Sequence, residues 1–416
     1  MRPSQRGLIA LLALPMLFVV VSRAWTQTVP IRTLAPIDAA TKTPIKNIYS
    51  EVRQTPSGKM LVNDALSRRL LRFDQSLATF EVVRDSVGRL PNSYGPTRAA
   101  LIRYGTDSSL FVDIESQAIV VVGPEGDFGR AMALPNPKDA NAAAGSRSGI
   151  DARGRLVYMI QSTPATSSTS STAATDSAVL VRADFDLRRV DTIARIKRAV
   201  PQKTSMTGFP DNPRIESVVN PLQSVDDWAV LSDGSVALVR GQDYHIDWIR
   251  PNGLLESSAK MPFDWRRVTN VEKQKMLDSA RQSQNRKDSL AATSTKPGAK
   301  TQSIIVGMNG RNVEVPATVI TTFVSLKEVL DYYPPIRVNA SRADLDNNLW
   351  ILPTTSLASQ NGELVYDVVN AKGELKERVR FPAGRSLVGF GKGGVVFLRW
   401  QDASGGWLVE RTHVIR

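Results

Sequence analysis

The sequence predicts an all-β protein, a six-bladed β-propeller with a mainly helical surface insertion between its fourth and fifth blades. Two observations lead to this prediction. A short phrase of sequence occurs six times: a turn, an apolar run of three or four residues, a polar elbow and a second apolar run. An apolar run this short between turn signals is typical of a buried strand, because a helix would need ten or more residues.

The clearest copy of the phrase occupies residues 56–74. The turn Ser57-Gly58 precedes the apolar run at residues 60–62, the elbow is Asn63-Asp64, and the second run ends at Phe73. Further copies lie at residues 107–126, 151–184, 232–253 and 344–373, and the last begins at residue 391. A strand pair this small cannot bury its own apolar face, so the copies must pack against one another around a ring.

Residues 1–24 have the composition of a signal peptide. Two arginines precede an apolar run at residues 8–21, and Ser22-Arg23-Ala24 places small residues at the positions that signal peptidase inspects. The alternative is a transmembrane anchor, but the run is shorter than the roughly 20 residues that a bilayer requires. We therefore expect a periplasmic or secreted protein that begins near Trp25 and makes no stable membrane insertion after cleavage.

Cysteine is absent, so an exported chain of this kind must be held together by its core alone. The chain is also basic, with a formal net charge of +13, three of which come from arginines in residues 1–24. Such a charge attracts polyanions in general. The basic residues are scattered in short pairs and no nucleic-acid-binding motif is present, which argues against a specific nucleic-acid partner.

The N-terminal segment at residues 25–46 is rich in proline and threonine, and we expect it to be extended and to supply a strand that closes the ring. The propeller then occupies residues 47–416. Its third repeat carries a Ser/Thr/Ala loop at residues 167–178, and its fifth carries a loop at residues 353–361. Residues 197–225, with four prolines, are expected to form an irregular connection.

The largest interruption is the insertion at residues 261–335. Thr269 and Glu272 have the spacing of a capping box, and the sequence after them predicts a helix with one narrow apolar stripe, which indicates a surface position. Asn309-Gly310 predicts a hairpin turn. Ser325 and Glu328 repeat the capping-box spacing before a second, short helix.

The composition excludes several kinds of chemistry. Only His245 and His413 are present, so a His-rich metal site is excluded, and the lack of cysteine excludes a thiol nucleophile and a haem attachment motif. His245 alternates along a predicted strand and is better explained as a structural residue. Nucleophile elbows, P-loops and dinucleotide-binding fingerprints are also missing.

The six repeats from about residue 47 onward resemble the six-bladed β-propeller superfamily of NHL-repeat, TolB-like and gluconolactonase or regucalcin-type proteins. Gluconolactonase-type members bind calcium in the central channel, and the resemblance implies Glu51, on the first inner strand, as a ligand of Ca²⁺. The phrase at residues 111–114 is also similar to that family, but the family's Arg-Pro-Asn-Asp segment has no counterpart here. Asp344, Asp346 and Asn347 are more simply turn residues.

Two functions from different classes follow. The first is an exported binding or scaffold propeller without a cofactor, which meets a protein or envelope ligand through the face that bears the long loops and the insertion. Asp64 and Asp113 mark this face, and we predict Glu51, Asp64, Asp113 and Asp243 as binding residues. The alternative is a calcium-dependent hydrolase of the gluconolactonase type, which uses the central channel and would need at least three oxygen ligands around one point there.

Overall fold

In this computed structural model, the structure describes residues 29–86, 94–95, 99–105, 107–114, 117–161, 176–208, 213–293, 301–308, 311–357 and 361–416. The predicted signal peptide, most of the predicted Ser/Thr/Ala loop and the predicted turn Asn309-Gly310 lie outside these residues. Among the described residues, no helix is long and apolar enough to cross a membrane.

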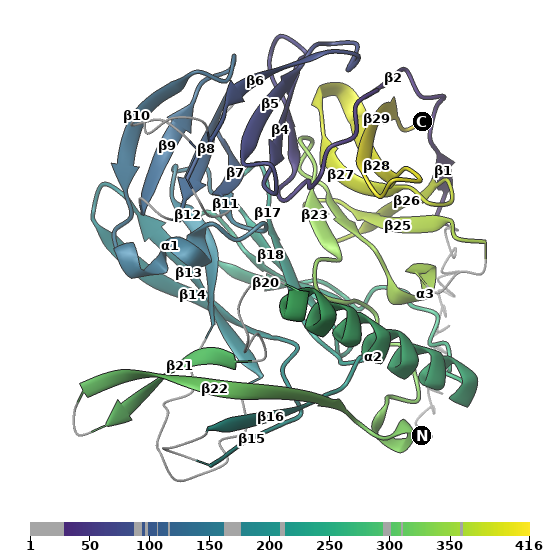
Figure 1. Cartoon of the computed structure of the whole chain (residues 1–416). Helices are drawn as coiled ribbons and strands as arrows, with labels where there is room; N and C mark the ends of the chain where they lie inside the picture. Colours follow the sequence, from purple (N-terminus) through teal and green to yellow (C-terminus); the bar gives the residue numbers. More distant parts are fainter. Residues whose placement is uncertain are drawn as a thin grey trace, which may run out of the picture.

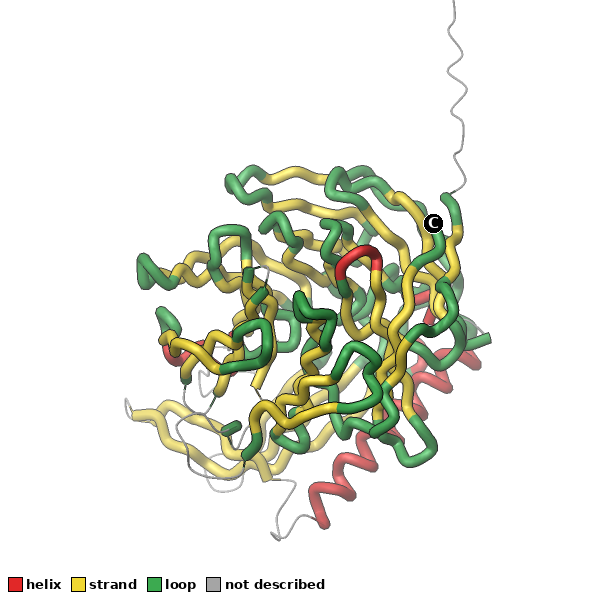
Figure 2. Tube along the Cα trace, turned by 90° about the horizontal axis from the view of Figure 1, so that it is seen from above, coloured by secondary structure: helices red, strands yellow, loops and turns green. Residues whose placement is uncertain are grey.

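The chain is a β-propeller whose sheets fan out around a common centre (Figures 1 and 2). One four-stranded antiparallel sheet contains β7 (Ala99–Tyr104), β8 (Ser108–Asp113), β9 (Ala118–Val122) and β10 (Phe128–Ala133). The next contains β11 (Gly149–Ile150), β12 (Leu156–Gln161), β13 (Ser177–Asp184) and β14 (Arg189–Lys197). A third contains β17 (Asp227–Val230), β18 (Val236–Arg240), β19 (His245–Ile249) and β20 (Leu255–Ser257).

The remaining strands of the ring form two larger sheets. A five-stranded sheet contains β23 (Ser341–Ala343), β24 (Leu349–Ile351), β25 (Leu364–Val369), β26 (Leu375–Phe381) and β1 (Ile31–Thr33). An eight-stranded sheet has, in spatial order, β2 (Ala39–Ala40), β29 (Trp407–His413), β28 (Val395–Gln401), β27 (Ser386–Phe390), β3 (Val52–Gln54), β4 (Met60–Asp64), β5 (Arg69–Phe73) and β6 (Phe80–Arg84). Short helices α1 (Ala140–Ala143) and α3 (Thr354–Leu357) lie in connections.

Hydrophobic clusters fill the spaces between neighbouring sheets, and they explain why the strands have continuous apolar runs. Leu110 and Val112 of β8 belong to the same buried cluster as Leu156 of β12. Phe111, between them, belongs to a different cluster together with Leu61 of β4. Side chains alternate between the two faces of a strand, so a sheet covered on both faces needs apolar residues at consecutive positions.

The N-terminal segment ties the ends of the chain together. β2 pairs antiparallel with β29, and β1 pairs parallel with β26. Thr41 donates its backbone N–H to the carbonyl of Val409, and Ile415 donates to the carbonyl of Thr33. The outer edges of two sheets are therefore covered by residues that lie more than 300 positions away in the sequence.

Two long connections combine into a separate body that we call the accessory module. It contains β15 (Lys203–Thr207), β16 (Arg214–Val219), helix α2 (Asn270–Thr293), β21 (Thr301–Met308), β22 (Arg311–Phe323) and the 3₁₀ helix η2 (Leu326–Glu328). Its sheet has the order β15-β16-β22-β21, with β16 and β22 parallel. α2 is the long helix that crosses the lower part of Figure 1.

The module has its own small core, which includes Leu222, Leu277, Val324, Val329 and Tyr333. The sequence prediction of an irregular connection at residues 197–225 was wrong, because β15 and β16 lie within it. β16 finds its partner β22 about 100 residues further along the chain, so no local pattern reports the pairing. The predicted insertion itself contains 24 residues of α2 but also the hairpin strands β21 and β22.

Candidate functional site

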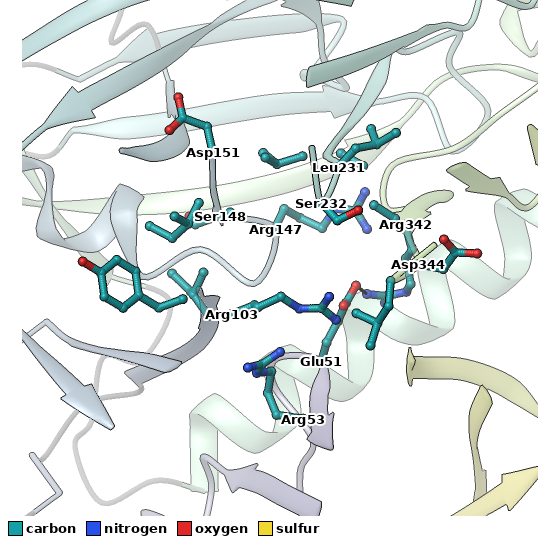
Figure 3. Close-up of a pocket in the computed structure, with 18 of the residues that line it drawn as sticks. Glu51, Arg53, Arg103, Arg147, Ser148, Asp151, Leu231, Ser232, Arg342 and Asp344 are labelled. Carbon is teal, nitrogen blue, oxygen red and sulfur yellow. Dashed lines mark hydrogen bonds and ion pairs between the residues drawn. The ribbon is translucent and has the colours of Figure 1, made fainter. Parts of the chain in front are cut away.

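A cavity of about 780 Å³ lies at the centre of the ring (Figure 3). Its walls come from the inner strands β3, β7, β11, β17 and β23, from the turns that follow them, and from the turn after β27. The lining residues therefore come from segments far apart in the sequence and are held by packed strands. Concave sites built in this way on a rigid scaffold are the usual places for ligand binding.

Four arginines reach the cavity. Arg53 lies on β3, Arg103 on β7 and Arg342 on β23, whereas Arg147 lies just before β11. Gly149 allows the segment of Arg147 to lie close to β17, because a Cβ at this position would be 2.8 Å from Cβ of Val230. Guanidinium groups stay protonated at neutral pH and bind carboxylate and phosphate groups through paired hydrogen bonds, so this cluster favours anions.

Two of the four guanidinium groups have carboxylate partners. Arg342 Nη1 lies 2.8 Å from Oε1 of Glu51. Arg147 Nη2 lies 3.2 Å from Oδ2 of the buried Asp227 and also donates to the carbonyl of Trp228 at 2.7 Å. Burial opposes the charge of Arg342, but Glu51, Tyr366 and Asp227 together outweigh it and the pKa of Arg342 is raised. Burial lowers the pKa of Arg147, and Asp227 offsets part of this effect.

The other two arginines lie close to each other without a carboxylate partner. Arg53 is fixed by neutral groups, because its Nε donates to Ser109 Oγ at 3.1 Å and its Nη2 donates to the carbonyl of Ser108 at 2.9 Å. The backbone of Arg103 pairs with Ser109 in the β7–β8 ladder, but its guanidinium forms no hydrogen bond or ion pair with any residue that the structure describes. Burial and the neighbouring charge of Arg103 together lower the pKa of Arg53 to about 9, and burial also lowers the pKa of Arg103.

A buried hydroxyl in the cavity wall is also unsatisfied. Ser341 is fully buried, and its backbone N–H donates to Asp227 Oδ2 at 2.7 Å. Its Oγ has no hydrogen-bond partner within the described part of the chain. Buried polar groups are nearly always hydrogen-bonded, so this exception in the wall of a cationic cavity marks a place where a polar ligand would complete the structure.

Two carboxylates that line the cavity, those of Asp344 and Asp151, are occupied by the fold itself. Asp344 accepts hydrogen bonds from the backbone N–H of Asn348 at 2.8 Å and from Trp350 Nε1 at 2.9 Å. Asp151 accepts from its own turn and forms an ion pair with Arg155 at 2.8 Å. Asp346, an exposed turn residue, also lines the cavity. Glu51 is the lining carboxylate that pairs with one of the four arginines, Arg342, and its side chain is 31% exposed.

Of the residues predicted as binding residues, only Glu51 lines the cavity. Asp64 is fully buried at the end of β4, accepts the backbone N–H of Asn47 at 3.1 Å, and lies 3.6 Å from Arg69. Asp113 is buried at the end of β8, outside the cavity wall. Asp64 and Asp113 each lie where a strand ends and a turn begins. This shared position in the repeat explains the spacing from which the sequence predicted a common binding face.

Asp243 lies in the turn between β18 and β19, outside the cavity wall. Its carboxylate lies 2.6 Å from Nδ1 of His245 and 3.4 Å from Nζ of Lys260. His245 also contacts Asp247 at 3.2 Å through Nε2, so the imidazole bridges two carboxylates on the strand. The prediction that His245 is a structural residue agrees with these contacts.

The calcium alternative can be compared with the ligands present. Within the described residues, no group of three or more His, Cys, Asp or Glu side chains could hold a metal ion. Glu51, the ligand that the resemblance implied, is paired with Arg342 and surrounded by three further guanidinium groups. A hard divalent cation needs several oxygen ligands in place of such cations, so the residues present do not fit Ca²⁺.

Sequence reasoning missed the arginines. The repeats were aligned on their apolar runs and acidic elbows, and in four of them an arginine precedes the first turn. An arginine shortly before the turn of a repeat was therefore the feature of the sequence that could have indicated the cluster. This signal is weak, because the chain has 53 lysines and arginines and a strand pattern does not tell which of them faces the axis.

Comparisons with known proteins give only distant likenesses. No family model and no curated protein matches the sequence. Among solved structures, regucalcin from Agrobacterium tumefaciens is 10% identical with a TM-score of 0.40, over 92% of this chain and 96% of that one. A member of the DUF4221 family from Bacteroides vulgatus is 10% identical with a TM-score of 0.44, over 92% and 98%. Virginiamycin B lyase from Staphylococcus aureus is 11% identical with a TM-score of 0.36, over 89% and 97%. The fold assignment rests on the sheet topology described above.

Proposed function

We propose that this protein is an exported β-propeller that binds a small anionic ligand in its central cavity. The cavity can hold a molecule of metabolite size, and its wall combines four guanidinium groups with a buried, unpaired hydroxyl. The proposal places the function in the channel, whereas the sequence pointed to the face that bears the loops. That face remains a predicted second contact surface for a protein or envelope partner.

The observation that carries the proposal is Arg103. A guanidinium that is half-buried, close to a second guanidinium and without a partner among the described residues is costly for the folded protein. Unpaired buried charges persist mainly at functional sites. A ligand carboxylate, sulfate or phosphate beside Arg103 would supply both the hydrogen bonds and the opposite charge that the fold leaves out.

We further infer that the ring has six blades. The eight-stranded sheet then counts as two blades, β3–β6 and β27–β29 with β2, whose innermost strands touch through two parallel residue pairs. Blades one and six are neighbours in a closed ring. The contact between their innermost strands therefore joins two blades into one sheet and does not change the number of blades. The proposed cavity is the central channel of this ring, and an inner strand or turn of each blade supplies part of its wall.

The test is anion titration of the purified mature protein by calorimetry. Phosphate, sulfate, citrate and succinate form the panel, and glucose serves as a neutral control. Arg103→Met should weaken the binding of the best anion at least tenfold, since a charge-assisted hydrogen bond contributes about 1.5–3 kcal/mol. Arg130→Met, which removes the same charge from an exposed position on β10, should leave the affinity within about twofold.

Equal binding by the Arg103→Met variant and the wild type would contradict this location. Calcium-dependent hydrolysis of a sugar lactone that is lost in Glu51→Gln would instead support the hydrolase alternative. Export has its own test: the N-terminal sequence of the envelope fraction should begin at Trp25 or within a few residues of it, and an intact Met1 in the cytoplasm would contradict export.

A further inference from the structure

One carboxylate lies within the cationic cluster of the cavity. Oε1 of Glu51 lies 2.8 Å from Arg342 Nη1, and the described residues offer no hydrogen-bond donor to its second oxygen. Figure 3 shows Arg103 and Arg342 extending toward Glu51 from two different strands. Nearly a third of the Glu51 side chain is exposed, 31%, so a molecule in the cavity can reach it.

The charge of Glu51 acts on the whole cluster. It favours the protonated form of Arg53, Arg103, Arg147 and Arg342 alike, which places it near all four guanidinium groups. An anion that binds Arg103 must therefore approach a fixed negative charge as well. Like charges in a partly buried site repel strongly, so a plain anion gains less here than four arginines would suggest.

A different ligand would satisfy both kinds of group. A molecule that carries a hydroxyl or ammonium group next to its anionic group can donate a hydrogen bond to the free oxygen of Glu51 while Arg103 binds the anion. A site built to hydrogen-bond such a donor rejects an analogue that lacks it, because the polar group of the site is then left unpaired. Glu51 is thus placed to contact the group that adjoins the anionic group of the ligand.

We propose that Glu51 selects ligands in which a hydroxyl or ammonium group adjoins the anionic group, such as hydroxy acids and amino acids. The inference rests on the proposed function, because it assigns a ligand class to the same cavity. It differs from a purely structural role, in which Glu51 would only hold Arg342 in place. It differs also from a role as a metal ligand, which the surrounding guanidinium groups do not fit.

A matched pair of ligands tests the selectivity. Malate and succinate carry the same two carboxylates and differ by one hydroxyl. The wild type should bind malate at least tenfold more tightly than succinate. In Glu51→Met, which removes the acceptor with little change in length, this ratio should fall below about threefold, and succinate should bind more tightly than it does to the wild type.

Two further variants serve as controls for the role of Glu51. Glu51→Gln keeps an acceptor oxygen without the charge, so its ratio should lie between those of the wild type and Glu51→Met. Glu256→Gln changes a glutamate that pairs with Arg250 at 2.6 Å on β20, outside the cavity, and should leave both affinities unchanged. Thermal unfolding of each variant checks that the fold is retained.

Equal wild-type affinity for malate and succinate overturns the inference, and so does a Glu51→Met variant that binds both ligands more weakly in the same proportion. If succinate binding depends on Arg103 but malate has no advantage, the proposed function stands and the selectivity fails. If no anion of either panel binds the wild type, both fail together.

Discussion

The cavity and the accessory module differ in whether their charged and polar groups have partners. In the module, the buried Lys273 donates to the carbonyl of Val329 at 2.8 Å and to Asp331 at 2.7 Å. Glu272 accepts the backbone N–H of Thr269 at 2.8 Å in a complete capping box. In the cavity, by contrast, a guanidinium and a buried hydroxyl are left without partners among the described residues.

This difference bears on whether the insertion or the cavity is the functional region, a choice that the sequence alone does not decide. An insertion of 75 residues attracts a functional interpretation because long additions are rarely neutral. Its structure, however, is a small satellite body with its own core, and its described residues Lys273 and Glu272 have hydrogen-bond partners, which is what stability alone requires. Buried polar atoms without hydrogen-bond partners also occur elsewhere in the ring, at Arg182 and Trp248. In the cavity such an atom coincides with four converging guanidinium groups, one of them unpaired, so the cavity is the stronger candidate.

The largest expected effect on stability is that of a substitution in the core of the module, and it tests the difference between the two regions. Leu277 of α2 is 1% exposed, so Leu277→Ala should destabilise the module by about 2–5 kcal/mol. Hydrogen exchange in α2 should rise while the strands of the ring keep their protection. Val271→Ala, at a 65% exposed position of the same helix, should cost less than about 0.5 kcal/mol.

Anion affinity should be the same in Leu277→Ala as in the wild type, because the cavity is built from the ring alone. A loss of binding in step with loss of the module would instead show that the module belongs to the site.

A buried ammonium gives the next largest effect. Lys273→Met keeps the apolar stem but leaves the carbonyl of Val329 without its donor, so it should cost about 1–3 kcal/mol. Asp331 is mostly exposed and remains solvated, which keeps the cost from rising further. Lys275→Met, at an exposed position of the same helix, is the control, and chemical denaturation measures both. Equal stability of the two variants would contradict the assignment of Lys273 as a structural residue.

Acid should weaken the module through two of its carboxylates. The backbone N–H of Thr269 and the nearby Arg266 lower the pKa of Glu272, and Lys273 lowers the pKa of Asp331. A carboxyl with a lowered folded pKa stabilises the protein above its unfolded pKa of about 4, and this stability is lost as the pH falls through the folded value. The protection factors of α2 amides, which compare exchange with that of the unfolded chain at the same pH, should therefore fall between about pH 5 and pH 3.

Glu272→Gln should reduce this acid sensitivity and lower the stability of the module at neutral pH by about 1 kcal/mol, the usual effect of a lost cap. The guanidinium groups of the cavity do not titrate in this range. If α2 in Glu272→Gln lost protection on acidification as much as in the wild type, Glu272 would not be the source of the acid sensitivity.

The sequence predicted those features that depend on neighbours in the chain. The run at Leu110–Val112 indicated a strand because both faces of its sheet are covered, and the capping boxes at Thr269 and Ser325 are present as their spacing indicated. The pairing of β16 with β22 was missed because it joins segments about 100 residues apart. The arginines of the cavity were missed for the same physical reason, since only the closed ring decides which side chains meet at its centre.

The smallest expected effect has the opposite sign to the others. Arg103 lies close to Arg53, whose pKa falls to about 9 through burial and through the charge of Arg103. Arg103→Met removes one of two like charges and leaves an apolar side chain of similar length in its place. Without ligand, this variant should be as stable as the wild type or more stable by up to about 1 kcal/mol, because binding sites commonly sacrifice stability for function.

The measurement is thermal unfolding of both proteins with and without the best anion of the panel. The wild type should gain stability as the anion concentration rises above its dissociation constant, whereas Arg103→Met should gain little. Arg130→Met should behave as the wild type does in both conditions. A loss of 2 kcal/mol or more in ligand-free Arg103→Met would give Arg103 a structural partner, because only a satisfied guanidinium costs that much to remove, and the contrast between cavity and module would then disappear.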